Sequence, residues 1–102
     1  MKLAAAQPVF GFERLLMPTI SSFYGIIIRM YYDEHAPPHF HALYQGDQAV
    51  IDIETLEVRA GRLPRRALNL VLDWARSHQN ELRANWQQVE AGKPLNDIDP
   101  LE

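Results

Sequence analysis

The chain has 102 residues, 47% of them hydrophobic, and these values predict one domain with a single core. It has no cysteine, which excludes disulfides, thiolate metal sites and a cysteine nucleophile. The formal net charge is −3, so nucleic-acid binding would depend on a local basic patch. No apolar run approaches the roughly 20 residues of a membrane helix, and the N-terminus lacks a signal-peptide pattern, so we expect a soluble protein without membrane contact.

The regular pattern of strands and helix begins at Met17. Residues 1–16 contain short apolar pieces interrupted by Pro8 and Gly11, and we interpret them as an N-terminal extension. Residues 17–102 are predicted to form a single α+β domain.

Several segments have the composition of strands. Residues 23–32 are rich in Ile, Tyr and Phe, which favours a first strand that ends at the prolines of residues 33–38. Residues 39–44 and 49–55 are predicted to be the second and third strands. Residues 56–60 are expected to extend the third strand or to form a short fourth one.

The second and third strands are separated by a hairpin signal in which glycine supplies a positive φ. A two-residue turn at residues 46–47 would place His41 opposite Asp52 and His39 opposite Glu54. Because side chains alternate along a strand, these four side chains would share the polar face of the hairpin.

The first strand can join this sheet with Arg29 and Tyr31 on the same polar face. The opposite phase would bury the Arg29 guanidinium without a partner, which is costly. The polar face is therefore predicted to carry Arg29, Tyr31, His39, His41, Asp52 and Glu54.

Residues 64–90 contain mainly helix-forming residues with an apolar stripe at helical spacing. The predicted fold is thus α+β, with a three- to four-stranded antiparallel sheet and one long C-terminal helix packed on one face. Trp74 and His78 lie at the edge of the stripe, where a partly buried aromatic ring and a hydrogen-bonded histidine are expected. The tail is expected to lie on the surface, with Ile98 and Leu101 as anchors.

Three of the four histidines lie close together, at His35, His39 and His41. A His-x-His pair on a strand directs both imidazoles to one side, about 7 Å apart at the backbone, which a divalent transition metal can bridge. The third ligand would be His35, Asp52 or Glu54. Imidazole favours zinc, manganese, iron or nickel over calcium as the cofactor.

The same face also suits acid–base chemistry without a metal. A histidine beside a carboxylate has a fixed tautomer, and Arg29 and Tyr31 would hold a phosphate or stabilise developing negative charge. Small metal-independent ribonucleases use groups of these kinds. The structural alternative is that these residues form polar cross-strand pairs that only stabilise the sheet, by about 0.2 to 1 kcal/mol each.

A second cluster contains four arginines within eight residues: Arg59, Arg62, Arg65 and Arg66. Such a positive corner on a mildly acidic protein predicts contact with phosphate groups or with an acidic partner. The alternative is a solvated loop and helix start.

The sequence also resembles a known family, the small bacterial proteins of domain-of-unknown-function family 4160 (DUF4160). The resemblance covers roughly residues 17–101, and its most specific part is the string Pro-Pro-His-Phe-His-Ala at residues 37–42. Further matching strings lie at residues 17–20, 23–26, 30–35 and 61–64, and in the helix that contains Trp74, Ala75, His78, Leu82 and Trp86. Members are commonly encoded beside another small protein, an arrangement like that of toxin–antitoxin pairs. The resemblance implies a cognate protein partner and a bacterial cytoplasmic location, but no reaction and no catalytic residues.

Three functions follow as hypotheses. The first is a component of a toxin–antitoxin-like pair that acts on RNA or on a cognate protein through the polar face. The second is a non-catalytic module that binds protein or DNA, and the third is a small metal-binding protein or metal-dependent enzyme that uses the His-x-His pair. Exposed aromatic side chains could also form the interface of a homodimer.

Overall fold

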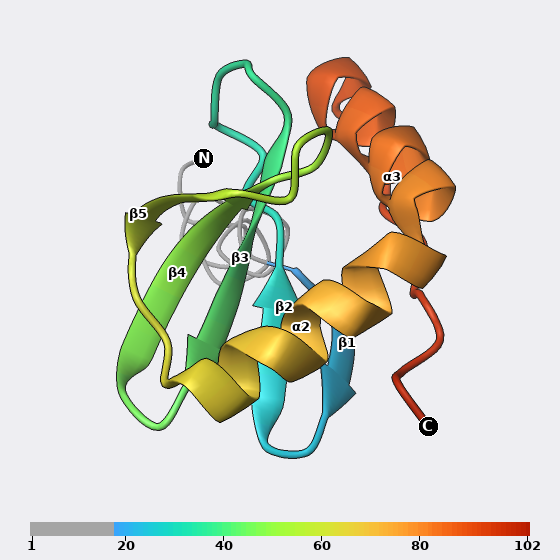
Figure 1. Cartoon of the computed structure of the whole chain (residues 1–102). Helices are drawn as coiled ribbons and strands as arrows, with labels where there is room; N and C mark the ends of the chain where they lie inside the picture. The colour runs from blue at the N-terminus through green and yellow to red at the C-terminus, as the bar shows by residue number, and fades with distance from the viewer. Residues whose placement is uncertain (1–17) are drawn as a thin grey trace, which may run out of the picture.

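The computed structural model describes residues 18–102, which form a five-stranded antiparallel sheet and two helices (Figure 1). The strands lie in chain order and comprise β1 (Thr19–Phe23), β2 (Ile26–Arg29), β3 (His39–Tyr44), β4 (Asp47–Asp52) and β5 (Val58–Gly61). The helices are α2 (Arg65–Ser77) and α3 (Gln79–Ala91). The α+β class and the antiparallel sheet are confirmed, although the sheet has one or two more strands than predicted and the helical part has two helices rather than one. The predicted N-terminal extension lies outside the described residues.

The predicted first strand, residues 23–32, is wrong because a turn divides it. Tyr24 and Gly25 both have positive φ, 50° and 79°, and they connect β1 to β2 so that Phe23 pairs with Ile26. A bulky residue rarely adopts this conformation, so the composition gave no turn signal at Tyr24. The predicted phase of the remaining strand is confirmed, since Ile26 and Ile28 are fully buried.

The predicted turn between β3 and β4 is wrong by one position. Gln45 and Gly46, with φ of 48° and 87°, form the turn, and Tyr44 pairs with Asp47. Every cross-strand partner therefore moves by two residues, and His41 faces Val50 instead of Asp52. A shift of two preserves the alternation of side chains, so the predicted faces of both strands are retained.

The predicted single helix is interrupted at His78. The backbone of His78 has φ −126° and ψ 21°, outside the helical region, and its N–H donates to the Ala75 carbonyl at 3.0 Å. The chain therefore changes direction there, and α3 leaves the face that α2 covers (Figure 1). Trp74 is completely buried, not partly buried as predicted, and its indole N–H donates to the Asp99 carbonyl at 2.8 Å.

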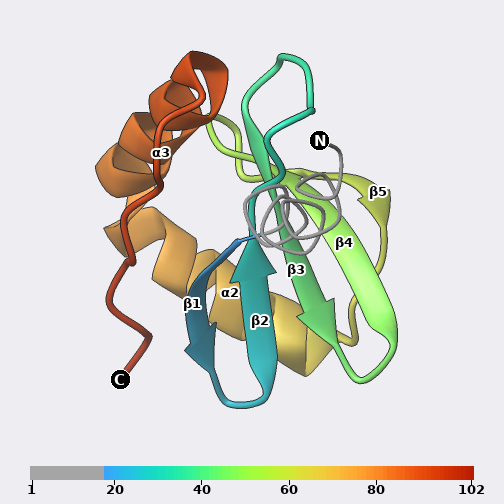
Figure 2. The same cartoon turned by 180° about the vertical axis from the view of Figure 1, so that it is seen from behind.

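The core lies between α2 and one face of the sheet. It contains Phe40, Ile51, Val71 and Trp74, all fully buried. The C-terminal tail runs beside β1 (Figure 2), and the predicted anchor Ile98 is buried and donates its N–H to the Ile20 carbonyl at 2.8 Å. Over residues 18–102, neither helix has the length and apolar character that crossing a bilayer requires.

Candidate metal centre

A carboxylate and two imidazoles converge on the face of the sheet opposite α2. Glu34 comes from the loop between β2 and β3, whereas His39 and His41 alternate on β3 and so project to the same side. Glu34 Oε1 lies 2.6 Å from His39 Nε2 and 2.7 Å from His41 Nε2. One carboxylate oxygen therefore contacts both rings, and these three residues are here called the Glu-His-His cluster.

The tautomer of His39 follows from its second ring nitrogen. Nδ1 lies 2.8 Å from the Pro37 carbonyl oxygen, which is only an acceptor, so Nδ1 must carry a proton and donate it. In a neutral ring, Nε2 would then direct its lone pair at the Glu34 carboxylate. The 2.6 Å contact thus requires a proton between the two atoms, and a metal ion could replace that proton only if the two atoms moved apart.

His41 is more deeply buried than His39. Its side chain is 6% exposed, compared with 12% for His39. The Tyr31 ring stacks on it with ring centroids 4.2 Å apart, and Gln48 Nε2 lies 3.3 Å from its Nδ1. With Gln48 as the donor, His41 carries its proton on Nε2 and donates it to Glu34.

The environment of Glu34 favours its charged form. Burial raises the pKa of this carboxyl, but hydrogen bonds and charge interactions with His41 and His39 outweigh burial, so the net pKa is lowered. Glu34 is therefore an anion at neutral pH, as a metal ligand or an imidazolium partner must be.

Asp52 and Glu54, the acids predicted to partner the histidines, are engaged elsewhere. Asp52 is opposite His39 in the sheet, yet its Oδ1 accepts the N–H groups of Glu54 and Thr55 at 2.8 and 2.9 Å. The Thr55 bond is the main reason that the pKa of Asp52 is lowered. The predicted pairing of His39 with Glu54 is wrong, because Glu54 lies beyond the end of β4.

Glu54 instead joins the sheet to α3. Its carboxylate accepts hydrogen bonds from the Arg83 guanidinium, the two shortest being Nε–Oε2 at 2.8 Å and Nη2–Oε1 at 2.9 Å. These bonds lower the pKa of Glu54 and raise that of Arg83. The Glu54 side chain therefore links the sheet to α3 and does not contribute to the Glu-His-His cluster.

Two other predicted residues do lie beside the Glu-His-His cluster. Arg29 is the cross-strand neighbour of His41, and its Nε donates to Thr19 Oγ1 at 3.3 Å. Tyr31 stacks on His41 as described. In contrast, His35 is exposed, and the ligand group found among residues 18–102 contains Glu34 in its place.

The predicted basic corner is exposed and is divided between two elements and their connection. Arg59 lies in β5, Arg62 follows it, and Arg65 and Arg66 form the first turn of α2. Arg59 Nη1 lies 3.6 Å from Asp52 Oδ2, so this arginine already has an acidic neighbour.

Glu34 is the site residue to which sequence reasoning gave no role. Its separation from His39 and His41, five and seven residues, matches no strand or helix spacing, because a loop supplies it. The available signal was its place directly before a histidine-rich string.

The donor set suits a transition metal. Two imidazole nitrogens and one carboxylate oxygen lie within 4.8 Å of one another, and such N/O sets bind zinc, iron, manganese or nickel. Ligand atoms around a tetrahedral ion with bonds of about 2.0–2.1 Å stand roughly 3.3 Å apart. Binding would therefore move Glu34 outward by several tenths of an ångström, which its position on a partly exposed loop allows.

Comparisons with known proteins identify the family alone. No curated protein and no solved structure matches the chain. The model of one family, described as "Domain of unknown function (DUF4160)", matches residues 25–87, which include β2 to β5, all of α2 and the Glu-His-His cluster. The chain therefore belongs to the DUF4160 family.

Proposed function

We propose that this protein binds a divalent transition metal through Glu34, His39 and His41. The observation that carries the proposal is the orientation of His39, whose Nδ1 donates to Pro37 while Nε2 faces a carboxylate oxygen at 2.6 Å. Histidines that bind metals commonly donate the other ring N–H to a backbone carbonyl, which fixes the tautomer and directs a lone pair at the ion. A cation between the three ligand atoms would satisfy both imidazoles and the carboxylate together.

Metal binding by His41 requires a particular orientation of the Gln48 amide. For His41 Nε2 to bind an ion, Nδ1 must carry the proton and donate it. Gln48 would then turn its amide so that oxygen, rather than nitrogen, faces Nδ1, a rotation that exchanges two atoms of nearly equal size. The amide orientation of Gln48 thus distinguishes the metal-bound state from the proton-linked state.

Three protein ligands leave coordination positions for water or a substrate. Catalytic zinc sites have this pattern, whereas structural zinc sites use four protein ligands. A bound ion would lower the pKa of coordinated water and supply a hydroxide nucleophile near neutral pH. Arg29, opposite His41 on the same face, would attract an anionic substrate.

The test is metal loading of the full chain. Protein stripped by a chelator is dialysed against Zn²⁺, Ni²⁺, Mn²⁺ or Fe²⁺ and its metal content is measured, with affinity obtained by calorimetry. We expect one ion per chain for at least one of these metals. Glu34→Gln, His39→Gln and His41→Gln should each weaken binding at least about tenfold. Imidazole ¹⁵N shifts should show both Nε2 atoms bound to the ion.

The chain provides a matched control. His78 also contacts a glutamate, Glu81, but this pair lies at the start of α3 and is not part of the ligand group. His78→Gln should leave metal binding unchanged, as should His35→Gln. If no metal reaches stoichiometry in the folded protein, or if the cluster variants bind as well as the parent, the proposal is wrong.

A second candidate is acid–base chemistry on RNA, as a component of a toxin–antitoxin-like pair. The observation that favours it is the same 2.6 Å contact read as an imidazolium–carboxylate pair, with Arg29 and Tyr31 on the same face. It predicts that expression arrests growth and that His39→Gln abolishes the arrest. It also predicts that the protein cleaves RNA in metal-depleted extracts. Relief of the arrest by a neighbouring gene product would identify the proposed cognate protein. Cleavage that requires added metal would favour the first candidate.

A further inference from the structure

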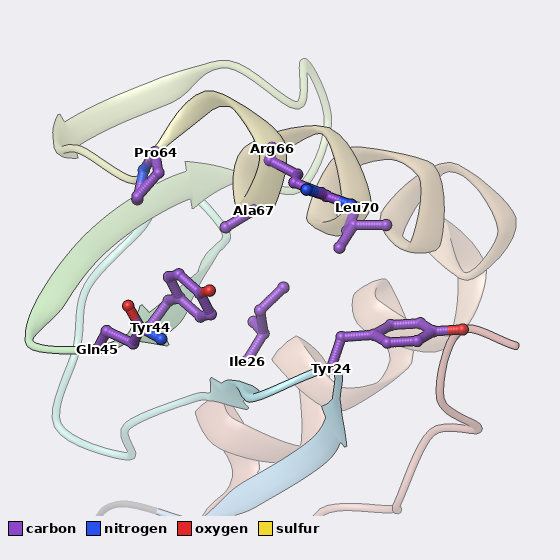
Figure 3. A pocket seen from close by; sticks show the side chains of 8 residues that line it. All are labelled: Tyr24, Ile26, Tyr44, Gln45, Pro64, Arg66, Ala67 and Leu70. Carbon is purple, nitrogen blue, oxygen red and sulfur yellow. The ribbon is translucent and has the colours of Figure 1, made fainter.

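A cavity of about 530 Å³ lies at the end of the sheet where the β1–β2 and β3–β4 turns approach the start of α2 (Figure 3). Tyr44 and Ile26 form its sheet side, and Arg66 and Leu70 form its helix side. The volume falls within the range of pockets that hold small molecules. Its floor belongs to the face covered by α2, whereas the Glu-His-His cluster belongs to the other face, so the two sites are separate.

The two turns contribute unusual residues to this cavity. Tyr24 and Gln45 each occupy the first central position of a two-residue turn, with φ of 50° and 48°, and both line the cavity. Asn, Asp and Gly are strongly preferred at such positions, and a bulky side chain there is a conformational outlier. Tyr24 is also 61% exposed, so burial in the core does not account for its presence. Side chains placed in such strained turns motivate a role for what they present to the cavity.

The cavity is also positively charged at its helix side. In the part of the chain that the structure describes, the ion pairs of arginine with a carboxylate involve Arg59, Arg76 and Arg83, and none involves Arg66. Arg65 precedes Arg66 in the first turn of α2, and that turn contains no acidic residue. An anion in the cavity would therefore meet a guanidinium that forms no ion pair with a carboxylate among residues 18–102.

We propose that this cavity binds a nucleotide, either as a free mononucleotide or as one unit of a single-stranded nucleic acid. The phosphate would pair with Arg66, whose planar fork of donors suits phosphate oxygens. The base would stack on an aromatic ring, for which the exposed Tyr24 and the Tyr44 wall are available. The Gln45 amide offers both a donor and an acceptor to a base edge.

The experiment titrates ¹⁵N-labelled full-length protein with AMP, UMP, the matching nucleosides and a hexaribonucleotide at about 0.15 M salt, an ionic strength at which surface charges are screened. We expect saturable shifts of the Tyr24, Gln45 and Arg66 amides, with affinity for AMP of about 1 mM or tighter. Arg66→Gln should reduce AMP affinity at least about fivefold more than Arg65→Gln does, because Arg65 carries the same charge but does not line the cavity. Adenosine, which lacks phosphate, should not distinguish these two variants.

Tyr24→Asn separates ligand binding from folding. Asparagine suits the turn better, so the variant should melt at a higher temperature than the parent, yet stacking loss should weaken binding about fivefold or more. Saturation by the hexamer but not by the mononucleotides assigns the ligand to single strands, and saturation by AMP or UMP assigns it to free nucleotides. The proposal fails if none of these ligands saturates, if the shifts map away from the cavity, or if Arg66→Gln and Tyr24→Asn bind like the parent.

Discussion

Replacement of Glu34 by Gln tests the charge at the centre of the Glu-His-His cluster. The parent carboxylate accepts from His39 and His41 at 2.6 and 2.7 Å, and a hydrogen bond to a charged group contributes about 1.5–3 kcal/mol. The Gln amide retains shape and one acceptor, so part of this stabilisation survives. The loss in unfolding free energy at about pH 6 should therefore be about 1–3 kcal/mol in metal-free protein.

Urea unfolding followed by the fluorescence of the buried Trp74 and Trp86 measures this loss. The pH dependence of this loss tests whether the charge on Glu34 causes it. The folded-state pKa of Glu34 is lowered, so its contribution is present above the unfolded value of about 4.3 and disappears as pH falls through the folded value. The parent and Glu34→Gln should differ most above about pH 5 and converge toward about pH 3. A difference that is absent at pH 6 or grows with acidification would refute the charged contact.

Three further substitutions test the fold. Gly61→Ala should destabilise by about 3 kcal/mol in urea unfolding, because φ is +71° and the added Cβ would lie 2.1 Å from the Gln48 carbonyl oxygen. Asn85→Ala should cost about 2–4 kcal/mol and expose the Asn96 amide to hydrogen exchange, since the buried Asn85 side chain bonds both the N–H and the carbonyl of Asn96 at 2.9 Å. Ser21→Ala should leave melting temperature unchanged or raise it, because the buried Ser21 hydroxyl has no hydrogen-bond partner within residues 18–102; a loss above about 0.5 kcal/mol would contradict this.

The sheet faces were predictable because side-chain alternation does not depend on the turn position. The turn prediction at residues 46–47 missed by one, yet Phe40 and Ile51 still pack beneath α2. Glycine at position 46 signalled a hairpin but did not determine whether it occupied the first or the second central position. At Tyr24 no such signal existed, since a bulky residue in a left-handed turn contradicts local preference, and the first hairpin was missed.

The break between the helices was unpredictable for a related reason. His78 and its neighbours have no proline or glycine to end a helix, so the local sequence favours continuation. Tertiary contacts override that preference. Gln79 Nε2 donates to the Ile53 carbonyl at 2.8 Å, and the Glu54–Arg83 pair fixes α3 against the turn after β4.

In the candidate site, too, the residues on a strand were predictable and those on a loop were not. The strand supplies His39 and His41, whose spacing alone predicted that they act together. The loop supplies the acid, Glu34, and the Pro37 carbonyl that sets a tautomer, and both depend on how residues 30–38 fold back over β3.

The segment that enters that loop, residues 30–32, is held in place by its side chains, which bears on whether the cluster exists before a ligand arrives. Met30 is buried in the core, Tyr31 stacks on His41, and the Tyr32 hydroxyl donates to the Lys93 carbonyl beyond α3 at 2.6 Å. Three consecutive side chains thus fix the segment that leads into Glu34. A site whose supporting residues are already packed loses less conformational entropy on binding than a loop ordered by the ligand. The carboxylate therefore needs only a small outward movement to admit an ion, and the affinity of the cluster should depend on Tyr31 and Tyr32 although neither supplies a ligand atom.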